Sequence, residues 1–80
     1  MTKLDMKWNN PDPKLKPNWK KWNKVKAVEI WQGIALSLNI DPKHVELVDG
    51  EWTVAGKPAR PEFQARLDIA IQHYVIKRAN

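Results

Sequence analysis

The 80-residue chain has no cysteine, and it contains only three glycines, two histidines and one serine. Without cysteine, disulfide bonds, thiolate metal sites and thiol nucleophiles are excluded. Three isolated glycines cannot form a glycine-rich phosphate-binding loop. The longest apolar-rich stretch, residues 25–40, is interrupted by polar residues and is too short to span a bilayer. The first ten residues also lack the apolar run of a signal peptide, so we expect a cytoplasmic protein with no stable membrane insertion.

The residues that could perform chemistry are few and scattered. Ser37 is the only serine, and the two histidines, His44 and His73, fall on separate expected elements. A nucleophilic hydroxyl needs a base within hydrogen-bond reach and a group that orients that base. Two histidines without converging carboxylates do not make a metal site. We therefore expect no enzyme: no catalytic residue, no metal ligand, no cofactor and no small-molecule substrate.

Positive charge gathers in the first third of the chain. The net charge is +5 overall, whereas it is +6 over residues 1–26, −3 over residues 27–59 and +2 over residues 60–80. Such asymmetry indicates an anionic partner, most often nucleic acid. The candidate nucleic-acid-binding residues are Lys14, Lys16, Lys20, Lys21, Lys24, Lys26 and Lys43.

Tryptophans lie among these lysines, and two of the five, Trp19 and Trp22, fall inside the basic stretch. Lysine mixed with aromatic residues suits a nucleic-acid backbone with stacking on exposed bases, and it also suits an anionic membrane surface. The alternative interpretation is a solvated lysine face over a short helix that tryptophans anchor to the core. The sequence does not decide whether the partner is a protein or a nucleic acid.

Prolines and hydrophobic periodicity divide the chain in two. Residues 1–18 are predicted to form an extended Pro/Lys-rich arm, because three closely spaced prolines oppose regular structure. Residues 19–80 are predicted to form a single all-α domain of three to four helices. A short helix begins at Trp19, and apolar stripes at three- and four-residue steps predict helices over residues 26–38 and from Pro61 onward. The last stripe comprises Phe63, Leu67, Ala70, Ile71, Tyr74 and Val75.

Residues 34–48 resemble a helix-turn-helix corner. Ala35 would supply the helix contact and Asn39 the left-handed turn, after which Asp41-Pro42 would begin a second helix over residues 42–48. The outward residues of that helix would include Glu46, whose charge repels phosphates, so the DNA-reading role fits poorly. An alternative is a β-hairpin near residues 46–54, because Asp49-Gly50 lies between β-forming residues; we favour the helix.

A family resemblance rests on three strings. They are Trp19-x-x-Trp22, then the run from Glu29 through the "ALSLNIDP" helix end at residues 35–42, then Phe63-x-x-Arg66-Leu67. Together they resemble uncharacterised bacterial and prophage-associated small helical proteins, over about residues 19–70. The resemblance implies a bacterial or mobile-element setting and no activity.

These observations predict a non-enzymatic binding module of a bacterial or prophage protein, acting through protein or nucleic-acid contacts. One alternative is a DNA-binding regulator that uses the helix-turn-helix-like corner. The other is a structural protein–protein interaction domain that uses Ile69, Ile76 or an exposed tryptophan.

Overall fold

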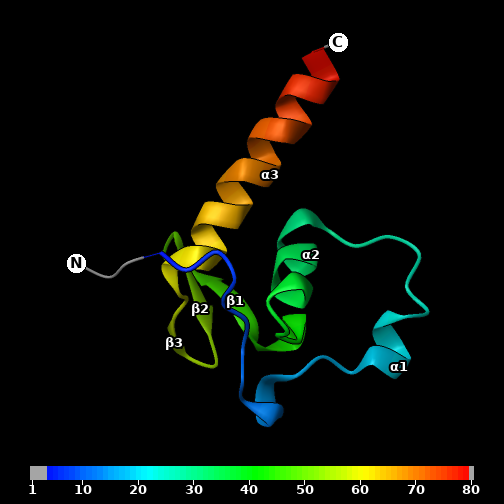
Figure 1. Ribbon diagram of the computed structural model, residues 1–80, viewed down its shortest axis with the longest axis vertical. Coiled ribbons are helices and arrows are strands. Elements are labelled where there is room, and N and C mark those ends of the chain that lie inside the picture. Colours follow the sequence, from blue (N-terminus) through cyan, green and yellow to red (C-terminus); the bar gives the residue numbers. More distant parts are fainter. Residues whose placement is uncertain (1–3, 80) are drawn as a thin grey trace.

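The computed structural model describes residues 4–79, and it places side chains for residues 4–73 (Figure 1). The elements in chain order are η1 (Pro13–Leu15), α1 (Trp19–Trp22), α2 (Ile30–Ser37), η2 (Pro42–His44), β1 (Val45–Val48), β2 (Glu51–Val54), β3 (Lys57–Pro58) and α3 (Pro61–Ala79). The three strands form one antiparallel sheet in the order β1-β2-β3. The prediction of an all-α fold is therefore wrong, because the domain mixes α-helices with a small sheet.

The error lies at Asp49-Gly50, where the chain forms a hairpin instead of the favoured helix over residues 42–48. Val48 pairs with Glu51, so the loop consists of two residues. Their φ angles are 50° for Asp49 and 81° for Gly50. Positive φ at both positions is what a type I′ turn requires, and its twist matches that of the flanking strands. Valines and threonine in β1 and β2 add β-propensity, and the expected helix shrinks to η2.

The corner after α2 confirms part of the sequence prediction and corrects the rest. Asn39 has a φ of 63°, as predicted, and Ile40 donates its backbone N–H to the Ala35 carbonyl at 2.9 Å. This pattern ends a helix in a left-handed turn. Asp41 then caps η2 by accepting from the Lys43 N–H at 3.0 Å. Because η2 is only three residues long and leads into β1, the prediction of a helix-turn-helix-like corner is wrong.

The start of α2 also differs from the prediction, since the helix begins at Ile30 and not at residue 26. The backbone N–H of Glu29 donates to the Gln32 side chain at 2.9 Å, which closes the N-terminus of the helix at that point. Val28, which falls within the predicted helix, lies before the observed one and is 42% exposed. Residues 23–29 therefore form a loop that belongs to neither α1 nor α2.

The core lies between α2, the first turns of α3 and one face of the sheet. Its fully buried apolar residues are Ala35, Leu38, Ile40, Val45, Phe63 and Leu67. Trp52 of β2 stacks on Trp31 at 5.7 Å between ring centroids and contacts Phe63 at 5.4 Å. The stripes of the two long helices thus meet through a strand tryptophan, which adds aromatic contact energy to a small core.

Helix α3 extends well beyond the rest of the domain (Figure 1). Its side chains are buried at Phe63 and Leu67, whereas Ile69 is 55% and Ile71 is 45% exposed. The structure does not describe the side chains of three residues to which the sequence assigns a role, Tyr74, Val75 and Ile76. None of the described helices combines the length and apolar character needed to cross a membrane.

Candidate functional site

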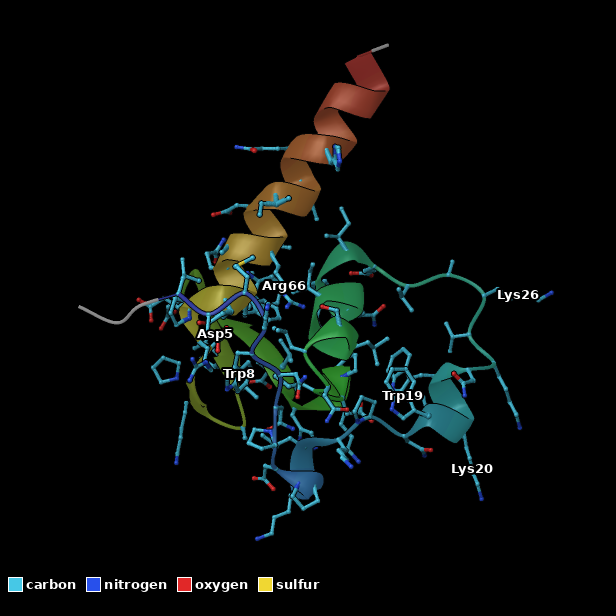
Figure 2. The ribbon with its side chains drawn as sticks, in the orientation of Figure 1. Asp5, Trp8, Trp19, Lys20, Lys26 and Arg66 are labelled. Carbon is cyan, nitrogen blue, oxygen red and sulfur yellow. The ribbon has the colours of Figure 1, made fainter. Side chains whose placement is uncertain are left out.

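Residues 4–18, here called the anchored segment, are tied to the start of α3. The Asp5 backbone N–H donates to the Glu62 carboxylate at 2.7 Å, and Arg66 donates to the Met6 carbonyl at 2.6 Å. Trp8 lies under the guanidinium of Arg60, 4.4 Å from its ring centroid. Figure 2 shows Asp5, Trp8 and Arg66 together beside the first turns of α3. The arm predicted from the prolines is thus part of the packed domain.

Glu62 is the buried acceptor that organises this contact. Its side chain has no exposed surface, and Arg60 donates to it at 2.9 Å. The Arg60 hydrogen bond and the Asp5 N–H outweigh burial and lower the pKa of Glu62 to about 2. Glu62 therefore stays ionised under ordinary conditions, as a buried carboxylate with a paired guanidinium does.

A second set of hydrogen bonds ties the anchored segment to the end of α2. The Asn10 backbone N–H donates to the Leu38 carbonyl at 2.7 Å, and its side chain donates to the Asn39 carbonyl at 3.0 Å. Asn39 returns a side-chain bond to the Asn10 carbonyl, also at 3.0 Å. Asn10 is 4% exposed, so these bonds replace water at otherwise unpaired backbone groups.

Asp41 joins the anchored segment to η2 and to α1. Its carboxylate accepts from the Asn18 N–H and the Lys43 N–H, each at 3.0 Å. Burial raises the pKa of Asp41, but these two N–H groups and the nearby Trp22 indole together lower it below its ordinary value. The Trp22 Nε1 lies near this carboxylate without hydrogen-bond geometry. Asp41 thereby places Lys43 next to the start of α1.

Residues 19–28, here called the outlying segment, differ sharply from what precedes them. Each of their hydrogen bonds joins residues no more than four positions apart. Apart from the half-buried Trp22, every residue of the segment is exposed. Figure 1 shows α1 and the following loop standing away from α2 and the sheet. The segment contains four lysines and no acidic residue.

The seven candidate lysines are all exposed, and six of them precede residue 27. Among the side chains that the structure describes, the one ion pair joins Arg60 and Glu62. The candidate lysines are therefore solvated cations without a carboxylate partner. In Figure 2, Lys20 and Lys26 point away from the body of the domain. The hydrogen bonds of Asp41 bring the backbone of Lys43 close to Asn18, just before α1, and to Leu15, which lies between Lys14 and Lys16.

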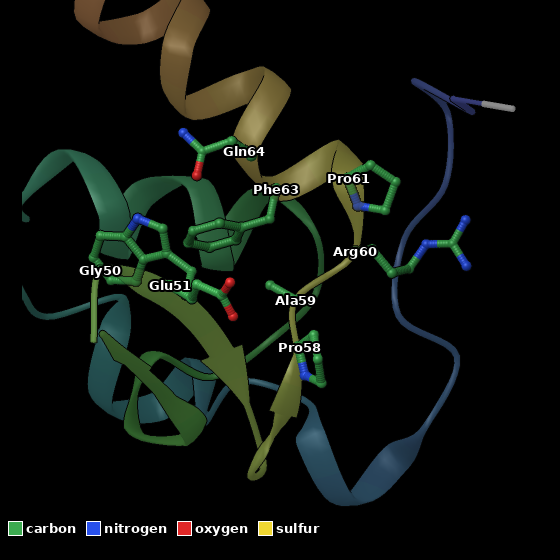
Figure 3. A pocket seen from close by; sticks show the side chains of 9 residues that line it. Gly50, Glu51, Pro58, Ala59, Arg60, Pro61, Phe63 and Gln64 are labelled. Carbon is green, nitrogen blue, oxygen red and sulfur yellow. The ribbon is translucent and has the colours of Figure 1, made fainter. Parts of the chain in front are cut away.

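Two hollows lined by the described residues bring no reactive groups together. One, of about 280 Å³, lies between the hairpin and the start of α3 (Figure 3). Its charged lining residues are Glu51 and Arg60, and Arg60 is directed toward the anchored segment. A second, of about 210 Å³, is lined mainly by apolar side chains such as Leu38 and Phe63. Both are smaller than typical ligand pockets.

The residues weighed for chemistry have structural roles or stand apart. Ser37 donates to the Ile34 carbonyl at 2.7 Å and accepts from Arg66 at 3.0 Å, so its hydroxyl helps to hold the anchored segment. His44 lies in η2 and His73 is exposed on α3. No group of three metal-ligating side chains converges among residues 4–73.

Two features of the site were not predicted from the sequence: which polar residues join distant parts of the chain, and which tryptophan is exposed. Asn10 and Glu62 carry no motif that marks them as buried, because each also pairs with a residue far away in the sequence, Asn39 and Asp5 respectively. Trp19 is 45% exposed, whereas Trp22, three residues later, is half-buried. No family model, curated protein or solved structure matches this chain.

Proposed function

We propose that this chain is a non-enzymatic binding module that binds nucleic acid through its basic surface. Its setting in this proposal is a bacterial or prophage protein. The observation that supports it is the outlying segment, which contains no acidic residue and whose four exposed lysines form no ion pair among the described side chains: Lys20, Lys21, Lys24 and Lys26. Clustered lysines of this kind bind the phosphate backbone by releasing its counterions.

The position of the segment supports the same proposal. It stands away from the domain on a single turn of helix, so its lysines reach a polyanion without a clash from the sheet or α3 (Figure 2). Lys43 adds a further charge beside α1 through the Asp41 bridge. The acidic middle of the chain, with Glu46, Asp49 and Glu51, lies on the hairpin and keeps the positive potential on one part of the surface.

The test is the salt dependence of binding to a fluorescein-labelled oligonucleotide, followed by fluorescence anisotropy. With about six phosphate contacts, the affinity falls roughly a thousandfold between about 50 and about 200 mM salt. Replacing all four lysines of the outlying segment by glutamine should remove most of this slope. Lys57→Gln, which removes an exposed charge on β3, is the matched control and should leave the slope nearly unchanged. Binding that ignores salt contradicts the proposal.

A second candidate function, protein–protein contact, is supported by α3. Ile69 and Ile71 are exposed on a helix that extends past the rest of the domain. Ile76, named with them from the sequence, lies outside the described side chains. Sedimentation equilibrium should then show self-association that increases with concentration and that Ile69→Lys abolishes. A monomer at all concentrations would remove self-association through this helix.

A further inference from the structure

The five tryptophans of this chain differ in what their rings contact. Trp31 and Trp52 stack on each other in the core, and Trp8 carries the Arg60 guanidinium on its face. Trp22 is half-buried beside Asp41, with the Lys21 ammonium 5.0 Å from its ring centroid. Four of the five indoles therefore have structural contacts that account for their presence.

Trp19 is the exception. It is 45% exposed, it belongs to no aromatic or cation–π pair among the described side chains, and it is not part of the core cluster. This exposure leaves part of Trp19 open to solvent and accessible to a ligand. Trp19 is the first residue of α1 in the outlying segment and is followed in the sequence by Lys20 and Lys21, and Figure 2 shows Lys20 pointing away from the domain.

We infer that Trp19 is a stacking platform for an unpaired base and that the ligand is single-stranded nucleic acid, an inference that rests on the proposed function. An aromatic face beside a row of lysines is the arrangement by which proteins bind single strands without reading sequence. The lysines hold the backbone while the indole covers the face of one base. Stacking is open to any base, because every base has a π-face.

The same geometry disfavours a duplex. In a duplex the base faces are already stacked, so an indole on the protein surface has no partner there, and sequence is read from base edges in the grooves. Reading the major groove takes a helix or a two-stranded ribbon with polar side chains aimed at base edges. Here α1 has four residues and η2 has three, and the hairpin carries acidic residues.

The experiment compares two probes under identical salt: an oligothymidylate of about twenty nucleotides and a mixed-sequence DNA duplex of the same length. Trp19→Ala should weaken binding of the single strand by about five- to 150-fold, the range for loss of one stacked base, and should leave the duplex affinity unchanged. Trp19→Phe keeps an aromatic face and should restore most of the affinity. Lys57→Gln is again the control, and thermal unfolding checks that each variant is folded.

The outcomes separate the two proposals. If neither probe binds, the proposed function fails, and with it this inference. If both probes bind with a steep salt dependence while Trp19→Ala changes neither, the proposed function stands and the stacking role of Trp19 is overturned. If vesicles of anionic phospholipid bind and oligonucleotides do not, the basic surface is a membrane contact, and both proposals are overturned.

Discussion

Two neighbouring stretches of this chain are alike in composition and opposite in structure. The anchored segment, residues 4–18, and the outlying segment, residues 19–28, are both rich in lysine and each contains asparagine and tryptophan. The first is joined by hydrogen bonds to residues 23 to 60 positions away, whereas the second bonds only to its near neighbours. Composition alone therefore does not tell a structural segment from one that is available for binding; the distant partners decide.

Acid should break this difference with the largest effect, because two of the bridges of the anchored segment end on the carboxylates of Glu62 and Asp41. The pKa of Glu62 is lowered from an ordinary 4.5 to about 2, and the pKa of Asp41 is also lowered. Between about pH 4.5 and about pH 2 the unfolded chain binds more protons at Glu62 than the folded chain does. The free energy of unfolding therefore falls as the pH falls through this range, whereas the contribution of Glu62 to it is constant above about pH 5.5.

The measurement is the urea midpoint at a series of pH values. Glu62→Gln should be less stable near neutral pH, yet should lose less on acidification than the parent chain. Glu46→Gln removes an exposed carboxylate on β1 and is the matched control, expected to follow the parent curve. A parent midpoint that stays constant from about pH 6 to about pH 2.5 would show that the carboxylate bridges do not hold the segment.

Asparagine substitutions test the same comparison at two positions. Asn10→Ala removes a side chain that is 4% exposed and leaves backbone groups of Asp12 and Asn39 unpaired, which should cost about 2 kcal/mol of unfolding free energy. Asn23→Ala lies at an exposed position in the outlying segment and should change it by less than about 0.5 kcal/mol. Chemical denaturation measures both. Equal effects at the two positions would contradict the distinction between the segments.

Limited trypsin digestion also compares the anchored segment with the outlying segment, and we expect the smallest effect from it. Sites after Lys21, Lys24 and Lys26 lie where the backbone has only local bonds, so cleavage there should be at least about tenfold faster than after Lys7 or Lys14. Mass spectrometry of early time points gives the order of cuts. In denaturant the sites should be cut at comparable rates, which controls for intrinsic preference. First cuts after Lys7 would place the weak point in the anchored segment instead.

Local signals in the sequence predicted several elements correctly. Asn39 does take the left-handed conformation, Asp41 does cap the turn that follows, and Pro61 does open the last helix. The hairpin was misjudged because Val45 and Val48 fit an apolar helix stripe as well as a strand. The two positive φ angles of Asp49 and Gly50 resolve that ambiguity, and turn chemistry outweighs periodicity over such short stretches.

The candidate site shows where such reasoning stops. Exposure of the lysines follows from their charge, but their role stays a prediction. Trp22 is half-buried beside Asp41, nineteen positions further along, and no periodic pattern encodes that pairing. Buried hydrogen-bond partners such as Asn10 and Asn39 also leave no trace in a hydrophobic pattern, because they satisfy backbone groups and not an apolar face.

The reach of the anchored segment also sets the order in which this domain can assemble. Asp5 and Met6 find their partners 57 and 60 residues later, at Glu62 and Arg66. The hairpin closes within about 1–10 μs once its residues are available, whereas a nascent chain made at about 5–20 residues per second needs roughly 3–12 s to supply those partners. Asp5 and Met6 can therefore dock only after the start of α3 has been made, whereas Asn10 and Asn18 can already pair with Leu38, Asn39 and Asp41. Until Trp8 has docked, the apolar hollow beside Leu38 and Phe63 lacks one of its walls.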